Sequence, residues 1–261
     1  MNKKRFCRSE QDIPASLERW FRNPPGQILL EQERDCLESM LSGLFGYYAV
    51  QVGRLGEGAQ LLRSSNIKSR ILVGPGAAGG EGITAIEAAA ESLPLRSDSV
   101  DMVLLPHTLD FSPDPHLVLR EAERVLIPEG RVIVIGFNPL SLWGGWRLFR
   151  RYRGHVPWCG QFLSQRRIND WLTLLGFEVE SCRMMMFRPP VRHTATLQRM
   201  LWLERIGERF WPMMGGGYVV QGVKRVSRLT PLQPAWKIRP GVLGGRLVEP
   251  TTRTTRTSSS G

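Results

Sequence analysis

The hydrophobic pattern along the chain is clearest between residues 91 and 137. An unbroken apolar run from Val100 to Leu105 is typical of a strand that is buried on both faces. Asp114-Pro115 then supplies an N-cap and a first helical residue. The next apolar residues recur at helical spacing, at Val118, Ala122, Val125 and Leu126. Pro128-Glu129-Gly130 breaks that helix, and a second apolar run covers Val132–Ile135. The pattern predicts a parallel strand–helix–strand unit with a right-handed crossover.

The carboxyl ends of these two strands are the places where a ligand is expected, because open parallel sheets bind ligands just beyond that edge. The first end is Pro106-His107-Thr108 and the second is Phe137-Asn138-Pro139. The sequence therefore predicts a binding site that both tripeptides border.

The remaining periodic segments predict further elements on either side of this unit. Helices are expected over residues 29–45, 166–175 and 197–210, with another opening at 59–63, and strands over 47–52, 71–73, 83–87, 176–180 and 217–223. We therefore expect one α/β domain over residues 29–228, after a lead-in at 1–28. Residues 229–261 are rich in Pro, Thr, Ser and Gly without a periodic apolar face, which predicts a disordered tail.

The ordered string within residues 91–137 resembles a known family. Leu93-Pro94 followed by residues 99–103 (SVDMV) is similar to "LPF…SFDVV". Residues 119–130 (LREAERVLIPEG) are similar to "LREAxRVLKPGG", with Glu129 in place of the first glycine. Both motifs belong to the class I S-adenosylmethionine (SAM) dependent methyltransferases, in the type 11 group related to the quinone-biosynthesis methyltransferases. The resemblance implies a Rossmann-like, doubly wound α/β fold, a mostly parallel sheet with an antiparallel last strand, and SAM as the methyl donor.

Charge and cysteine content indicate which partners and which cellular compartment to expect. The net charge of +11 suits a polyanionic partner, but no nucleic-acid-binding motif accompanies it, and the tail carries five basic residues against one acidic residue. The four cysteines have no paired spacing, so a disulfide framework or zinc site has little support and a reducing cytoplasm is expected. No apolar run is long enough for a transmembrane segment.

The resemblance places the cofactor loop at Gln51-Val52-Gly53-Arg54-Leu55-Gly56. In the family this loop reads D/E-x-G-x-G-x-G and is followed by a helix whose N-terminus faces the cofactor's carboxylate. Here Gln51 replaces the acid and Leu55 replaces the middle glycine. Gln51 can accept a hydrogen bond from the cofactor's amino group but cannot form an ion pair with it.

Further cofactor contacts are expected at Gly74, Ala89, Glu91 and Pro106 by the same resemblance. In the family, an acidic residue after the second strand holds the ribose hydroxyls, but this chain has Val73-Gly74-Pro75 there. The family's aspartate that contacts the adenine aligns with Ala89 in this chain. Glu87 and Glu91 are candidate substitutes for that aspartate, although Glu91 is equally consistent with a solvated helix residue. Pro106 closes the fourth strand at the cofactor edge.

His107 and Asp110 are the candidate bases at the edge of the fourth strand, and His107 is the candidate catalytic residue because an imidazole suits base chemistry near neutral pH. The alternative is that His107 packs on the cofactor or caps its loop. Residues 141–158 interleave Trp with Arg where related folds cover the substrate, which suits a small-molecule substrate, a peripheral membrane contact or a lid with buried aromatics. The sequence thus predicts a SAM-dependent methyltransferase acting on a small molecule, or alternatively a catalytically weak relative that serves as a regulatory or binding module.

Overall fold

The computed structural model describes residues 13–55, 60–80, 82–150, 154–191 and 193–225. All of them lie in one compact unit, Met1–Val226. The predicted tail at 229–261 and the glycine Gly56 lie outside the described residues.

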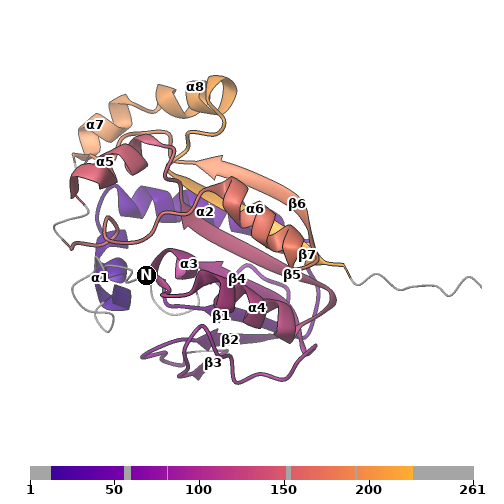
Figure 1. Ribbon diagram of the computed structural model, residues 1–261. Coiled ribbons are helices and arrows are strands. Elements are labelled where there is room, and N and C mark those ends of the chain that lie inside the picture. The colour runs from indigo at the N-terminus through magenta and orange to yellow at the C-terminus, as the bar shows by residue number, and fades with distance from the viewer. Residues whose placement is uncertain (1–12, 56–59, 81, 151–153, 192, 226–261) are drawn as a thin grey trace, which may run out of the picture. The chain divides into compact units, whose positions relative to one another are not determined.

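A seven-stranded sheet forms the centre of this unit, in the order β3-β2-β1-β4-β5-β7-β6 (Figure 1). The strands are β1 Tyr48–Val52, β2 Ser69–Val73, β3 Ile83–Ile86, β4 Val100–Pro106, β5 Leu126–Phe137, β6 Phe177–Met185 and β7 Gly217–Lys224. Pairing is parallel from β3 through β5, and β7 runs antiparallel to both of its neighbours. The predicted α/β fold with a doubly wound sheet and an antiparallel last strand is confirmed.

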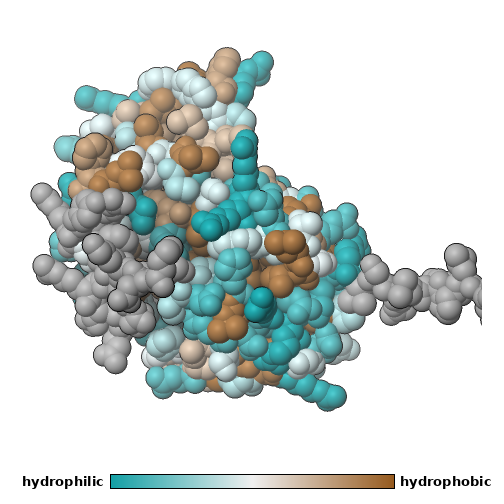
Figure 2. All heavy atoms as spheres, in the orientation of Figure 1, coloured by the Kyte–Doolittle hydropathy of each residue, from teal (hydrophilic) through white to brown (hydrophobic). Residues whose placement is uncertain are grey.

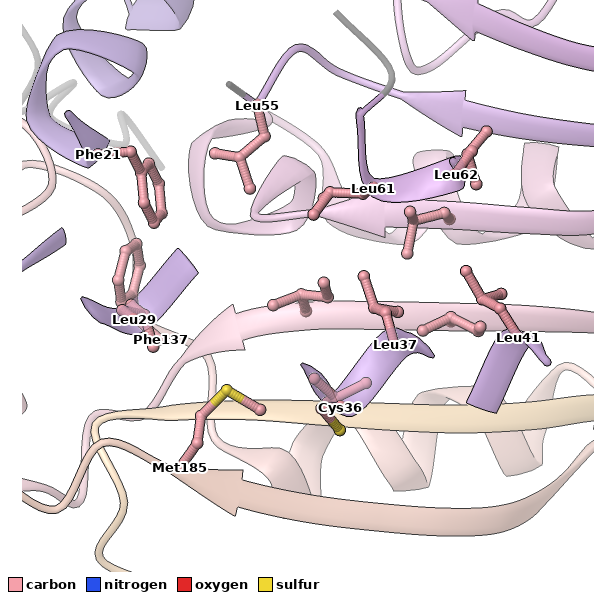
Figure 3. Packing of buried hydrophobic residues seen from close by; sticks show 14 of the residues in the cluster. Phe21, Leu29, Cys36, Leu37, Leu41, Leu55, Leu61, Leu62, Phe137 and Met185 are labelled. Atoms are coloured by element: carbon pink, nitrogen blue, oxygen red, sulfur yellow. The ribbon is translucent and has the colours of Figure 1, made fainter. Parts of the chain in front are cut away.

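The helices pack on both faces of the sheet. They are α1 Ile13–Phe21, α2 Gly26–Leu41, the 3-10 turn η1 Gln60–Leu62, α3 Thr108–Phe111, α4 Pro115–Val125, α5 Leu142–Arg150, α6 Gln165–Leu174, α7 Thr194–Arg199 and α8 Trp202–Phe210. One hydrophobic cluster contains buried residues of α4 and α6, and the other contains those of α1 and α2. Figure 3 shows part of the second cluster, where Leu37 and Leu41 of α2 lie near Leu61 and Leu62 of η1.

The strand–helix–strand unit is built as the pattern predicts, except that α4 ends at Val125 and that β5 begins at Leu126 and includes Pro128-Glu129-Gly130. Asp114 caps α4 by accepting hydrogen bonds from the backbone N–H groups of His116 and Leu117, at 3.1 and 3.2 Å. The apolar residues of α4 are buried against the sheet, and β4 pairs in parallel with β5. Glu129, which stands where the family has glycine, adopts φ +65°. That left-handed conformation is the one for which the glycine is suited.

The segment between β1 and β2 differs from prediction. The helix expected to open at 59–63 is a single 3-10 turn, and no α-helix lies between β1 and β4 in the described part of the chain. Leu61 and Leu62 are buried, but the sequence Arg63-Ser64-Ser65-Asn66 that follows supplies no further apolar position. One turn is therefore all that this segment can bury against the sheet.

Three other features depart from the expected pattern. The helix predicted over 197–210 is divided into α7 and α8. Part of the predicted lead-in forms α1, whose Leu17 and Phe21 are buried in the core. Cys159 is disulfide-bonded, which the spacing of the cysteines did not predict, whereas Cys36 and Cys182 are free.

Candidate functional site

The loops that follow β1, β2 and β4 are joined by backbone hydrogen bonds at one edge of the sheet. Gly53 donates its N–H to Val73 at 2.8 Å, and Gly74 donates to Ile86 at 3.1 Å. The Thr108 hydroxyl, just beyond β4, donates to the carbonyl of Val52. These bonds bring the predicted cofactor residues Gly53 and Gly74 together with the end of β4.

Gln51 is fully buried in β1 and leaves one polar atom without a partner. Its Nε2 donates to the carbonyl of Gly53 at 3.0 Å, but its Oε1 has no hydrogen-bond partner. A buried acceptor without a donor is costly, by roughly 1–3 kcal/mol, unless a ligand satisfies it. Gln51 therefore fits a ligand that brings an N–H donor to the end of β1, as the amino group of SAM would.

The backbone conformation of residue 53 and the atoms around it both require glycine at this position. Its φ of +95° is a conformation that residues with a Cβ rarely adopt, and a Cβ placed there would lie 3.0 Å from Thr108 Oγ1. A Cβ at Gly74 would lie 3.5 Å from the backbone of Gly53, so the two glycine loops run close to each other.

The rest of the loop after β1 is unlike a cofactor cradle. Leu55 is fully buried among core residues, where the family has a glycine, and its side chain occupies space inside the protein rather than at the loop surface. Arg54 donates to the carbonyl of Gly76 and to the carboxylate of Glu18, each at 2.9 Å. The guanidinium of Arg54 thus joins the loops after β1 and β2 to helix α1.

Of the residues expected near the ribose and adenine, Gly74 and Ala89 carry no carboxylate, whereas Glu87 is exposed directly after β3. Ala89 is exposed in the loop after β3 and offers only a methyl group. The carboxylate of Glu91 accepts a hydrogen bond from the hydroxyl of Ser112, at 2.5 Å. Pro106 is buried as the last residue of β4. The residues present therefore fit the amino-acid end of SAM better than its nucleoside end.

His107 lies at the centre of a buried polar cluster that also contains Glu33 and Asp110. Its Nε2 is 2.9 Å from Glu33 Oε1, and its Nδ1 is 3.1 Å from Asp110 Oδ2. A left-handed backbone, with φ +53°, turns the ring inward, where it stacks on Phe137 with ring centroids 4.1 Å apart. All three polar side chains are at most 1% exposed.

Opposing effects act on the charges of this cluster. Burial by itself would lower the pKa of His107, but the charge of Glu33 and the hydrogen bonds to Asp110 and Glu33 outweigh burial and raise that pKa to about 9. Burial raises the pKa of Asp110, against the hydrogen bond from His107 and those from the backbone of Phe137 and Leu163. The raised pKa favours the imidazolium form of His107, and both of its ring nitrogens are directed at carboxylates.

Glu33 was not among the residues predicted for the site, although its position carried a signal. It lies on α2 between the buried residues Leu29 and Leu37, on the face that packs into the core. An acidic residue on an apolar helix face is unusual, because a buried carboxylate needs a partner. Its Oε2 and the Oδ1 of Asp110 remain without hydrogen-bond partners.

Aromatic rings line the same edge of the sheet. Phe137 is stacked on Phe162 at 4.9 Å, and Trp20 of α1 meets Phe137 and Trp143 edge-on at 6.0 and 5.8 Å. Within the predicted substrate cover at 141–158, Trp143 is fully buried, whereas Trp146 is 41% exposed. Part of this segment is therefore core, and part of it faces outward.

Comparison with known proteins agrees with the fold. A family model described as a methyltransferase domain matches residues 62–134. The uncharacterized protein YafS of Escherichia coli (strain K12) is 32% identical over 165 residues, which is 61% of this chain and 65% of YafS. The ubiquinone/menaquinone biosynthesis C-methyltransferase UbiE of Acidiphilium cryptum is 32% identical over 130 residues, or 49% of each protein. The matched segments span less than two thirds of either relative.

A solved structure extends the likeness over most of the described residues. The crystal structure of a SAM-dependent methyltransferase from Thermotoga maritima superimposes with a TM-score of 0.58 at 22% identity, and the match covers 82% of this chain and 97% of that one. At this identity the likeness concerns the fold alone. The chain therefore has the fold of this SAM-dependent methyltransferase, and its residues 62–134 match the model of a methyltransferase domain.

Proposed function

We propose that the protein binds SAM and transfers its methyl group to a small-molecule acceptor. The observation that carries this proposal is the buried, unpartnered Oε1 of Gln51 near the end of β1, two residues before Gly53. Gln51 would accept a hydrogen bond from the amino group of SAM. Gly53, whose φ of +95° suits glycine, would shape the loop beside the bound molecule.

The chain's own residues have a limited task in such a reaction. Bound SAM supplies a methyl group that is already activated, so the protein mainly aligns the acceptor and excludes water. The rings of Phe137 and Trp143 are stacked beside the end of β5, and these apolar side chains would help to exclude water. We assign His107 a positioning role, because its contacts with Glu33 hold helix α2 against the end of β4.

A second candidate function is supported by the altered loop. A methyltransferase fold that has lost SAM binding could act as a regulatory or binding module. The contact of Arg54 with Glu18 and Gly76, the buried Leu55 and the 3-10 turn in place of a helix favour this alternative. All three features alter the segment that binds the cofactor in the family.

Thermal unfolding in the presence of SAM, and separately of its demethylated product, distinguishes the two functions. A ligand at 100 times its dissociation constant stabilises the native state by about 2.7 kcal/mol. The proposal predicts a rise in melting temperature with each compound. The absence of any rise at millimolar concentrations of both would leave the binding module as the better account.

A further inference from the structure

Exposed hydrophobic side chains are concentrated in two segments, at residues 140–149 and 201–214, which we call the α5–α8 face. Of the sixteen large hydrophobic residues that are exposed in the described part of the chain, eleven belong to it. They are Leu140, Leu142, Trp146, Leu148, Phe149, Leu201, Trp202, Phe210, Trp211, Met213 and Met214. Single exposed hydrophobic residues are normal on a protein surface, but a cluster of this size marks an interaction site.

Arg188 connects the helices of this face. It is 4% exposed, and its carbonyl accepts a hydrogen bond from Trp143 of α5 at 2.8 Å. Its guanidinium donates to the carbonyl of Leu197 in α7 at 3.2 Å and to the carboxylate of Glu204 in α8 at 2.7 Å. The three helices are thus tied to one buried residue, and Figure 1 shows them grouped at one side of the sheet.

The loop that follows α8 is fixed to the sheet as well. Asn138, at the end of β5, donates from its amide to the carbonyls of Met213 and Gly215 at 2.8 and 2.9 Å. In Figure 2 brown, hydrophobic residues lie among white and teal ones over the region of α5 and α7, and other brown residues lie elsewhere on this view. The exposed apolar side chains are therefore presented by an anchored framework.

Arginines accompany the apolar residues of this face. Residues 141–158, which include α5, contain four arginines and no Asp or Glu, whereas α8 carries two arginines and two glutamates. Arg150 lies over the ring of Trp146, 5.3 Å from its centroid, and Arg205 and Arg209 are exposed on α8. Of the two glutamates of α8, Glu204 is turned inward and paired with Arg188.

We propose that the α5–α8 face docks on the surface of a bilayer that contains anionic phospholipids. Trp and Arg suit the headgroup level, Leu and Phe suit the acyl boundary, and basic residues near the surface are attracted to anionic lipid. No helix among the described residues is long and apolar enough to cross a membrane, so the contact is peripheral. The proposal does not depend on methyl transfer.

Two other occupants fit this face less well. A second copy of the chain in a two-fold contact would bring the same arginines against each other, which is unfavourable. A nucleic acid would satisfy the arginines but would leave Phe149, Phe210 and their apolar neighbours without a hydrophobic environment.

The test is co-sedimentation of the full chain with vesicles of phosphatidylcholine, with or without phosphatidylglycerol. One variant removes apolar anchors, Phe149→Ser with Phe210→Ser, and another reverses charge, Arg205→Glu with Arg209→Glu. The matched control is Leu174→Ser on α6, because Leu174 is 84% exposed and Phe149 is 83% exposed. Melting temperatures of all variants establish that each is folded.

The proposal predicts binding to the anionic vesicles, weakened at least about tenfold in each double variant and unchanged in the control. Basic residues elsewhere in the chain are common to all variants and cannot produce this difference. Three results would overturn the proposal. These are no binding to anionic vesicles, equal binding by the parent and both double variants, and a lipid-independent dimer that the Phe149→Ser, Phe210→Ser variant abolishes.

Discussion

Replacing Glu33 by Gln removes one charge from the buried cluster around His107 while keeping the shape of the side chain. Both Glu33 and His107 are fully buried and lie 2.9 Å apart, and the charge of Glu33 is the largest of the effects that raise the pKa of His107. Breaking a buried ion pair typically costs about 3–5 kcal/mol of stability. Because the amide can still accept a hydrogen bond from the imidazole, we expect Glu33→Gln to cost about 2–3 kcal/mol at pH 6.

The pH dependence of this cost follows from the pKa of His107. A pKa raised from 6.5 to about 9 stabilises the folded state fully below pH 6.5, and this stabilisation is lost as the pH rises through 9. Each pKa unit corresponds to about 1.4 kcal/mol, so the whole effect, to which Asp110 also contributes, is about 3 kcal/mol. The difference between the parent and Glu33→Gln should therefore be largest near pH 6 and small above pH 9.

Urea unfolding at several pH values measures this difference directly. Glu38→Gln is the control, because Glu38 is exposed on the same helix and its loss should change stability by less than about 0.5 kcal/mol. A cost for Glu33→Gln that is as small as the control's, or that is the same at pH 6 and above pH 9, would refute the account of this cluster.

Three further predictions concern other parts of the chain. Gly53→Ala should lower the stability by about 1–2 kcal/mol in chemical unfolding, because of its positive φ and the nearby Thr108, whereas Gly80→Ala, with nothing within 4 Å of the new Cβ, should be nearly neutral. Asp114→Ala removes the cap of α4 and should cost about 1 kcal/mol in the same assay. Deletion of residues 229–261 should leave the melting temperature unchanged, since their composition predicts no packed core, and a clear decrease would contradict that expectation.

The centre of the fold could be predicted from the sequence because its signals are local. The buried strands β4 and β5 are continuous apolar runs, and α4 between them has both a cap and an amphipathic face. The division of α7 from α8 has no such signal, since neither Gly nor Pro occurs between Leu197 and Trp202. It reflects tertiary contacts, because Arg188 bonds to a backbone carbonyl in α7 and to a side chain in α8.

The candidate site was only partly predictable, because some of its contacts are tertiary and leave no local signal in the sequence. Gln51, Gly53 and His107 lie at strand ends that the periodicity located. The pairing of His107 with Glu33 joins residues 74 positions apart and depends on how α2 packs, which no local pattern specifies. A helix opening at residues 59–63 was predicted, whereas the described residues Gln60–Leu62 form one short 3-10 turn.

The central claim is that the side chain of Gln51 accepts a hydrogen bond from the amino group of SAM. Calorimetric titration of SAM into the parent, Gln51→Leu and Gln51→Glu tests this claim most directly. Removing the acceptor in Gln51→Leu should weaken binding at least about tenfold, because a hydrogen bond to a charged group contributes about 1.5–3 kcal/mol. Gln51→Glu introduces the family's carboxylate and should bind at least as tightly as the parent, since it can form an ion pair with the same group. SAM binding that is equal in the parent and in a folded Gln51→Leu variant, or absent from all three proteins, would contradict the claim.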